Sequence, residues 1–263
     1  MNDAVATDVL VGALTDPFDE CHMGITAENI AKEWNISRED QDAFAMESHR
    51  RAALAVKTSK FKDQIIPVEL KTKGKVVLFE TDESPRPDTA LEALAQLKPA
   101  FDPKGSVTAG NSSSISDGAA ALVLMDRELA LERGLKPLAR LIGYVVTGVE
   151  PKYMGIGPVS AVRKLLKDAG LTVDKIEVFE VNEAFAAQAI AVCRELRLPQ
   201  DRVNPNGSGI SLGHPSGATG AMLTVKALYQ LRLTVGTYAL VTMCIGGGQG
   251  IAALFERVNS AEP

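Results

Sequence analysis

The chain has 263 residues, 46% of them hydrophobic and 23% charged, which is enough apolar material for a buried core and excludes a disordered tail, a collagen-like rod or a small disulfide-stapled domain. Its formal net charge of −5 provides no basic field for nucleic acid, and no apolar run approaches the roughly 18–20 residues that cross a membrane. Three scattered cysteines form no disulfide framework, so we expect a cytoplasmic α/β protein with no nucleic-acid partner and no membrane partner.

The first half of the chain is polar and irregular. Residues 27–55 show helical spacing, and Ser37 followed by acidic residues is typical of a helix N-cap. Short strands are predicted at 65–70 and 76–79, and a loop with two prolines at 82–89. The lysines between residues 57 and 75 form either a solvated face or a rim that attracts a polyphosphate ligand.

The second half alternates strands with helices, which is typical of a layered α/β domain. We predict strands at 107–111, 119–125, 137–149, 176–181, 238–244 and 250–258, and helices that end at Gly134 or cover 158–169, 183–196 and 216–231. Gly170 follows one of these helices directly, as a glycine that ends a helix does.

Three segments place a reactive side chain beside glycines or at the end of a regular element. The first is Val-Asn-Glu-Ala-Phe-Ala at 181–186, where a predicted strand runs into a predicted helix with Asn182 at the junction. Asn182 is therefore either the N-cap of that helix or a functional side chain.

The second segment is the glycine-dense loop at 206–220, which contains His214. Glycines on both sides let a ligand approach the backbone closely, and Pro215 suits the first turn of the following helix. We expect His214 to be functional and not merely a packing residue.

The third segment is Met-Cys-Ile-Gly-Gly-Gly-Gln-Gly at 243–250. The backbone N–H groups of three consecutive glycines can lower the pKa of the Cys244 thiol or hold a developing oxyanion. Cys193, by contrast, lies on a predicted helix and is expected to be an inert packing residue.

Two rival site classes have weaker support. Gly155-Ile156-Gly157 before a helix resembles a dinucleotide-binding loop, but Ser160 takes the place of the third glycine. The adjacent Cys21 and His22 do not make a metal site, because the three histidines of the chain lack the spacing of zinc ligands.

Taken together, the three segments resemble the C-terminal signatures of the thiolase family. Asn-Glu-Ala-Phe-Ala at 182–186, Gly-His-Pro-x-Gly-Ala-x-Gly at 213–220 and Cys-x-Gly-Gly-Gly-x-Gly at 244–250 follow the order and spacing of that family. Supporting matches lie at 22–24, 26–29, 41–45, 108–113 and 117–120. Ser216, where an aliphatic residue is usual, and Ser114, where glycine is common, depart from the pattern.

The resemblance implies a thiolase-like layered αβα fold, with a C-terminal half-domain and a loop domain. It implies an acetyl-CoA C-acyltransferase, which transfers an acyl group between coenzyme A (CoA) and a 3-ketoacyl-CoA through an acyl-cysteine. His214 matches the histidine that activates the nucleophilic cysteine and binds the thioester oxygen, and Asn182 matches the residue that holds a water in the same oxyanion hole. Cys244 matches the acid/base at the α-carbon, and the N–H of Gly246 matches a donor of the second oxyanion hole.

The resemblance also implies where CoA binds. His22, Met23 and Ser113 match positions that line the pantetheine channel, and Arg86 matches a basic residue beside the adenine, where a guanidinium can stack. CoA is then a substrate, no metal and no resident cofactor is implied, and homo-oligomers are usual in the family.

One part of the family's machinery is not recognisable in the sequence. Neither Cys21 nor Cys193 sits in the glycine-containing motif of the nucleophile, and the acidic neighbours of Cys21 would raise its thiol pKa. We expect a loop domain at 1–115, a remnant of the N-terminal thiolase half at 116–135 with exposed apolar faces, and a C-terminal thiolase domain at 136–263.

Three hypotheses about the chain remain. The first is that it is a truncated thiolase, or one subunit of a split enzyme whose partner chain supplies the N-terminal half. The second is that it is a catalytically silent CoA-binding module. The third is that it is a gene fragment with no stable function.

Overall fold

The second half of the chain builds a four-stranded sheet in the order β3-β6-β5-β4. In the computed structural model, which describes residues 6, 8–72 and 74–258, β3 (Ala139–Gly148) and β5 (Tyr238–Ile245) pair antiparallel with β6 (Gln249–Arg257). The short β4 (Val178–Val181) pairs in parallel with β5, so these two strands end at the same edge of the sheet.

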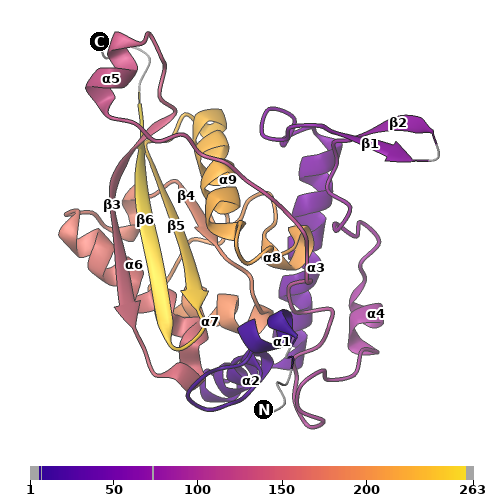
Figure 1. Cartoon of the computed structure of the whole chain (residues 1–263). Coiled ribbons are helices and arrows are strands. Elements are labelled where there is room, and N and C mark those ends of the chain that lie inside the picture. The colour runs from indigo at the N-terminus through magenta and orange to yellow at the C-terminus, as the bar shows by residue number, and fades with distance from the viewer. Residues whose placement is uncertain (1–5, 7, 73, 259–263) are drawn as a thin grey trace, which may run out of the picture.

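Helices cover both faces of this sheet, because its strands send alternate apolar side chains into two separate cores. Phe179, Leu240 and Leu254 pack against α6 (Gly157–Asp168) and α7 (Ala186–Leu196). The neighbouring Val178, Ala239 and Val241 pack against α9 (Thr219–Thr234), which lies on the other face (Figure 1). The predicted layered αβα fold is therefore confirmed.

The first half adds two helices that pack against α7. Helices α2 (Met23–Glu33) and α3 (Arg38–Lys57) share a core with α7 that includes Ile30 and Ile190. Ser37 caps α3 by accepting a hydrogen bond from the backbone N–H of Asp40, which confirms the predicted N-cap.

The other elements are short. They are α1 (Val9–Ala13), α4 (Leu91–Ala95), α5 (Arg127–Glu132), α8 (Gly209–Leu212), the 3₁₀ turns Pro151–Ile156 and Val173–Lys175, β1 (Val68–Thr72) and β2 (Lys75–Phe79). β1 and β2 form a hairpin that projects from the rest of the chain (Figure 1), and every residue of these two strands is exposed. The sequence did not predict α4 or α8, and α9 begins three residues later than expected, after a turn at 215–218.

Two predicted strands are wrong. Residues 107–111 form a turn in which the Asn111 side chain accepts the Thr108 N–H, and only Thr108 makes an isolated bridge, to Pro99. Residues 119–125 are not a strand, because none of the described residues lies beside them as a pairing partner. Their side chains are correspondingly exposed, by 87% at Val123 and 73% at Leu124, as expected for this segment.

No helix in the described ranges is long and apolar enough to span a membrane. The domain boundaries at residues 115 and 135 remain a prediction.

Candidate active site

Asn182 lies directly after β4, at the end of the sheet where β5 also ends. Its backbone N–H donates to the Thr242 carbonyl oxygen of β5 at 3.0 Å, which continues the parallel pairing by one residue. Helix α7 begins at Ala186 with Phe185 as its N-cap, so the alternative that Asn182 caps this helix is wrong. The Asn182 side chain is fully buried, and its Nδ2 lies 3.3 Å from Nε2 of His214.

Glycines allow the loop before His214 to pack closely against its surroundings. A Cβ on Gly209 would lie 2.8 Å from the Glu183 carbonyl oxygen and 3.0 Å from Asn182 Oδ1. Gly213 has a φ of +93°, which L side chains rarely adopt, and a Cβ there would collide with Ser116. These glycines hold His214 against the end of β4.

The imidazole of His214 is half-buried between two polar side chains. Its Nδ1 lies 2.7 Å from Oγ1 of Thr219, opposite the Asn182 contact on Nε2. Burial lowers the pKa of His214 below its ordinary value, so the ring is neutral at pH 7. A neutral imidazole beside an amide can act as a proton acceptor.

The buried carboxyl groups of Glu183 and Glu180 form hydrogen bonds and an ion pair at the base of the loop before His214. Glu183 accepts hydrogen bonds from Ser48 Oγ at 2.6 Å, Asn204 Nδ2 at 2.8 Å and the Ile210 N–H at 3.4 Å. Lys226 of α9 donates to Glu180 at 2.8 Å and to the Gly207 carbonyl oxygen. Burial raises the pKa of both carboxyl groups, and the bonds from Ser48 and Lys226 oppose that rise.

Cys244 lies near the end of β5, just before the glycine turn that joins β5 to β6. The sequence left two effects open for the glycine N–H groups, a lowered thiol pKa or the holding of an oxyanion, and the first is wrong. Cys244 is 7% exposed, and desolvation raises the pKa of its thiol to about 12. The thiol is therefore protonated at neutral pH.

Cys244 belongs to an apolar cluster that links the sheet to the first half of the chain. This cluster includes Met23, Met154, Ala184 and Phe185, and Ala184 is only two residues from Asn182. The neighbouring Gly246 is exposed, and a Cβ there would lie 2.9 Å from Cε of Met23. Asn182, with His214 beside it, and the Cys244 turn thus follow the parallel strands β4 and β5 at the same edge of the sheet.

His22 and Ser113 lie around the same cluster. The His22 ring stacks on Phe101 with 4.7 Å between ring centroids, and Phe101 meets the edge of Phe185 at 6.0 Å. The Ser113 N–H donates to the Ala184 carbonyl oxygen at 2.9 Å. Three predicted CoA contacts, His22, Met23 and Ser113, therefore lie close to Cys244 and its neighbours.

Within the described ranges, no contact joins Arg86 to the apolar cluster around Cys244. It is exposed on the predicted loop over 82–89, where its backbone N–H donates to Nδ1 of His49 on α3 at 3.2 Å. Its proposed role beside adenine stays a prediction.

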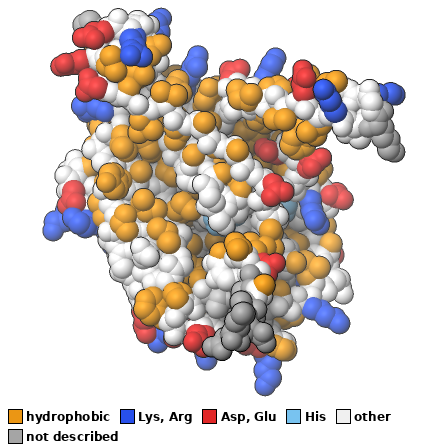
Figure 2. All heavy atoms as spheres, viewed as in Figure 1, with side chains coloured by type: hydrophobic (Ala, Val, Ile, Leu, Met, Phe, Trp, Pro, Cys, Tyr) orange, Lys and Arg blue, Asp and Glu red, His pale blue; other side chains and the backbone are white. Residues whose placement is uncertain are grey.

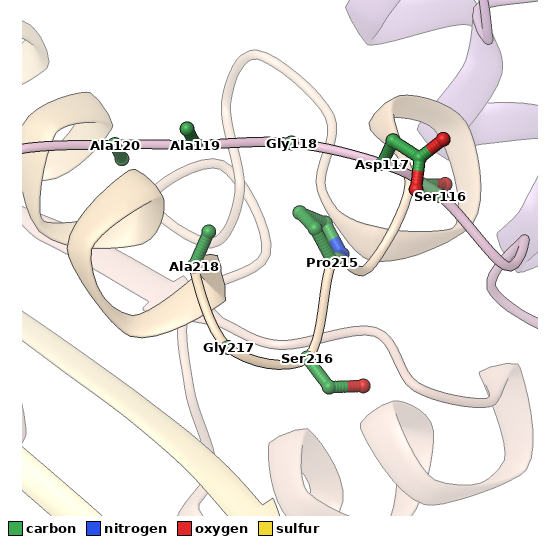
Figure 3. Close-up of a pocket in the computed structure, with 9 residues that line it drawn as sticks. All are labelled: Ser116, Asp117, Gly118, Ala119, Ala120, Pro215, Ser216, Gly217 and Ala218. Atoms are coloured by element: carbon green, nitrogen blue, oxygen red, sulfur yellow. The ribbon is translucent and has the colours of Figure 1, made fainter. Parts of the chain in front are cut away.

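A groove is lined in part by Pro215, the residue that follows His214. It has a volume of about 440 Å³ and is lined by residues 116–120 and 215–218. Figure 3 shows Pro215 and Ala218 pointing toward the 116–120 segment, while the Ser216 side chain points away from it. Figure 2 shows histidine atoms within a hollow near the middle of one face, surrounded by apolar side chains.

Sequence reasoning missed Thr219, Phe101 and Phe185 as members of the site. Thr219 follows His214 by five residues, and the helix start at 219 turns its hydroxyl toward the ring. The sequence signal that could have identified Thr219 is its position in the first turn of the helix that follows the His214 loop. Phe101 has no comparable signal, because only the tertiary fold brings it to His22.

The rival site classes gain no support. A Cβ on Gly157 would collide with the Gln249 carbonyl, and one on Gly155 would lie 2.6 Å from Ile30, so these glycines serve close packing. Burial first, then Asp16 and Asp19, raise the Cys21 thiol pKa, which confirms the predicted direction. Burial raises the pKa of Cys193 to about 12, as expected for a packing thiol. No cluster of three or more possible metal ligands occurs in the described part of the chain.

Comparison with known protein families gives two matches that together cover most of the chain. The model of the N-terminal domain of thiolase matches residues 1–128, and the model of the C-terminal domain matches residues 135–257. The beta-ketothiolase BktB of Cupriavidus necator is 58% identical over 259 residues, which are 98% of this chain and 66% of that protein. The acetyl-CoA acetyltransferase of Escherichia coli is 51% identical over 238 residues, 90% of this chain and 60% of that protein.

Solved structures of acetyl-CoA acetyltransferases and of a 3-ketoacyl-CoA thiolase also match the chain. The Bacillus anthracis acetyl-CoA acetyltransferase superposes with a TM-score of 0.94 at 46% identity, covering 98% of this chain and 66% of that one. Human mitochondrial 3-ketoacyl-CoA thiolase superposes with a TM-score of 0.92 at 41% identity, covering 98% and 65%. The chain thus spans about two thirds of the length of the relatives that it matches.

Proposed function

The chain belongs to the thiolase family, and from this premise we propose that it carries acyl-transfer machinery of an acetyl-CoA C-acyltransferase. The proposed reaction moves an acyl group between CoA and a 3-ketoacyl-CoA. The observation that carries the proposal is that Asn182, in contact with His214, follows β4 at the sheet edge where β5 leads into the Cys244–Gly246 turn. CoA is the substrate, and no metal takes part in the proposed steps.

In this proposal His214 serves the first half of the reaction. Its Nε2 takes the proton of the nucleophilic thiol, so that the S–H bond breaks and an N–H bond forms. The new N–H then donates to the thioester oxygen, and Asn182 holds a water at the same oxygen. The neutral state that burial imposes on His214 supports the role of base.

In this proposal Cys244 and Gly246 take part in breaking and forming the carbon–carbon bond of the ketoacyl-CoA. The nucleophilic thiolate bonds to the 3-keto carbon, the bond from that carbon to the α-carbon breaks, and the α-carbon of the resulting enolate takes the proton of the neutral Cys244 thiol. The Cys244 thiolate then takes the proton of the incoming CoA thiol, whose sulfur bonds to the acyl carbon while the nucleophilic cysteine leaves and takes its proton back from His214. The Gly246 N–H donates to the oxygen of the 3-keto carbon while that oxygen is negatively charged, whereas the enolate oxygen is the thioester oxygen held by His214 and the water; removing one such donor costs about 3–4 kcal/mol in comparable sites. The raised pKa supports the role of proton donor, and it also makes the thiolate a stronger base for the reverse reaction.

The apolar cluster suits the uncharged arm of CoA. Met23, Phe101 and Phe185 offer apolar and aromatic surface beside Cys244, and His22 and Ser113 add polar groups at its border. We assign the pantetheine arm to this cluster and the adenine to Arg86. The surroundings of Arg86 are consistent with a role at the protein surface.

The proposed reaction needs a nucleophilic cysteine in addition to these residues. We propose that polypeptide other than these 263 residues supplies it, either in the same longer chain or in a partner chain. The exposed apolar side chains at 122–125 support such a covering partner. Homo-oligomers and a reducing, cytoplasmic location are part of the same proposal, and three free cysteines agree with that location.

Complementation tests the proposed function. The chain is mixed with the part of the C. necator relative that it does not span, and consumption of a 3-ketoacyl-CoA is followed with and without CoA. We expect CoA-dependent cleavage in the mixture, and we expect His214→Ala to lower its rate at least ~100-fold. A mixture of two folded polypeptides without cleavage, or with cleavage that His214→Ala leaves unchanged, contradicts the proposal.

A catalytically silent CoA-binding module is the second candidate function. The apolar cluster beside Cys244 favours it equally, because binding needs the cluster but not the nucleophile. Calorimetry with CoA separates the candidates: this alternative predicts saturable binding with no turnover in any mixture, and absence of binding contradicts it.

A further inference from the structure

A continuous line of hydrogen bonds passes through the His214 ring. Asn182 Nδ2 lies 3.3 Å from Nε2, and Nδ1 lies 2.7 Å from Thr219 Oγ1. The same Thr219 hydroxyl lies 2.9 Å from the Pro215 carbonyl oxygen. The Pro215 carbonyl oxygen also accepts the backbone N–H groups of Ala218 and Thr219, at 2.7 and 2.9 Å.

The two ends of the line determine the direction of its bonds. The amide nitrogen of Asn182 can only donate, so the Nε2 that faces it must accept. The Pro215 carbonyl can only accept, so the Thr219 hydroxyl donates its hydrogen there and accepts from Nδ1. Both ends therefore favour the ring proton on Nδ1, and the Thr219 end does so through a hydroxyl whose own hydrogen goes to a backbone carbonyl.

We propose that Thr219 is a positioning residue, which keeps the proton of neutral His214 on Nδ1 and so leaves Nε2 unprotonated. The partner of one ring nitrogen commonly fixes the protonation of the other. Thr219 acts through His214 in this proposal and does not touch the substrate.

The other two histidines have the opposite arrangement. Nδ1 of His22 accepts the Gly24 N–H at 3.0 Å, and Nδ1 of His49 accepts the Arg86 N–H at 3.2 Å. Their rings must therefore carry the proton on Nε2. Burial lowers the pKa of all three histidines, so all are neutral slightly above pH 7. His22 and His49 therefore serve as internal references, because their ring proton lies on Nε2 whereas that of His214 is proposed to lie on Nδ1.

The catalytic meaning of this arrangement rests on the proposed function. When Nε2 takes a thiol proton, it loses its hydrogen bond from the Asn182 amide, Nδ1–H keeps its bond to Thr219, and Nε2–H then donates to a thioester oxygen. A ring with its resting proton on Nε2 could not accept the thiol proton at that atom.

Nitrogen NMR of the ¹⁵N-labelled chain at pH 7.5, without acyl-CoA, tests the proposal directly. Long-range proton–nitrogen spectra show which ring nitrogen carries the proton, and His22→Gln and His49→Gln assign the three spin systems. We expect Nδ1–H for His214 and Nε2–H for His22 and His49. Nε2–H at His214 overturns the proposal, whether or not the chain has acyltransferase activity.

Two variants then show whether Thr219 is the cause. Thr219→Val keeps the shape and removes the hydroxyl, and we expect His214 to lose its exclusive Nδ1–H form. Thr219→Ser keeps the hydroxyl and should retain that form. Unchanged His22 and His49 signals report that each variant is folded. The proposal is overturned if Thr219→Val folds and its His214 remains wholly in the Nδ1–H form. If Thr219→Val does not fold, the proposal is overturned when folded Thr219→Ser loses the Nδ1–H form.

Discussion

The chemistry of the individual residues follows from how deeply each one is buried. Desolvation keeps His214 uncharged and keeps the Cys244 thiol protonated, so the resting site holds a neutral base and a neutral acid. The sequence selected three segments, and the structure brings Asn182 of one into contact with His214 of another. Of the two effects that the sequence left open for the glycine N–H groups, a lowered Cys244 pKa is wrong, because glycine N–H groups can be read from a motif but burial among Met23 and Phe185 cannot.

The pH dependence of stability is expected to reflect the buried His214. Its pKa is lower in the folded chain than the ~6.5 of an exposed histidine, so the unfolded chain binds more protons as the pH falls. The stabilisation is therefore complete above about pH 6.5 and decreases as the pH falls toward the folded pKa. Between pH 7.5 and 5.5, the wild-type free energy of unfolding should decrease more than that of His214→Gln in urea denaturation. Equal decreases would contradict this account.

The elements place these residues together through strand ends and close packing. β4 and β5 run in parallel, and their shared end holds both Asn182 and the Cys244 turn. Alternation of strands and helices predicted most of this half correctly. The strand at 119–125 failed because an apolar run does not show whether a pairing strand lies beside it, and α8 was missed because a four-residue helix leaves little periodicity.

A substitution at Gly209 should disturb the contact between α8 and the end of β4. The Cβ of Gly209→Ala would lie 2.8 Å from the Glu183 carbonyl oxygen, so backbone must move. We expect a loss of about 1–3 kcal/mol in the free energy of unfolding. Gly217→Ala, in the same loop with nothing within 4 Å of the new Cβ, is the matched control and should change it by less than about 0.5 kcal/mol. Equal effects of the two substitutions would show that the loop is not packed in this way.

The ion pair between Lys226 and Glu180 ties α9 to β4. Their side chains are 4% and 0% exposed, so Lys226→Met leaves a buried carboxyl group without its partner. We expect the free energy of unfolding to fall by about 3–5 kcal/mol, and Lys226→Met with Glu180→Leu to recover a large part of it. Denaturant titrations of the two single variants and the double variant measure the coupling. Additive losses would argue against a stabilising pair.

At the scale of the whole molecule, apolar surface is exposed where the proposed partner would bind. Figure 2 shows hydrophobic side chains gathered over the face that carries β3 and β6. The sequence predicted exposed apolar faces at 119–134 from the family resemblance, and Val123 and Leu124 confirm it. Residue patterns alone could not predict this, since a buried strand and an uncovered one have the same composition.

This exposed surface should make the chain associate when it is alone. We expect Val123→Glu with Leu124→Glu to reduce concentration-dependent association in sedimentation experiments, because charge opposes burial of that segment. Leu233→Glu, at a position of α9 that is 54% exposed, is the control and should have a smaller effect. Association that is equal in the three proteins would place the contact elsewhere.

The most direct test of the central claim compares the two buried thiols in the complemented enzyme. Cys244 and Cys193 share a pKa raised to about 12 by burial, but only Cys244 lies beside the proposed thioester site. Cleavage of a 3-ketoacyl-CoA should fall at least ~100-fold in Cys244→Ala and stay within a few-fold of wild type in Cys193→Ala. Cleavage by Cys244→Ala at the wild-type rate would contradict the account.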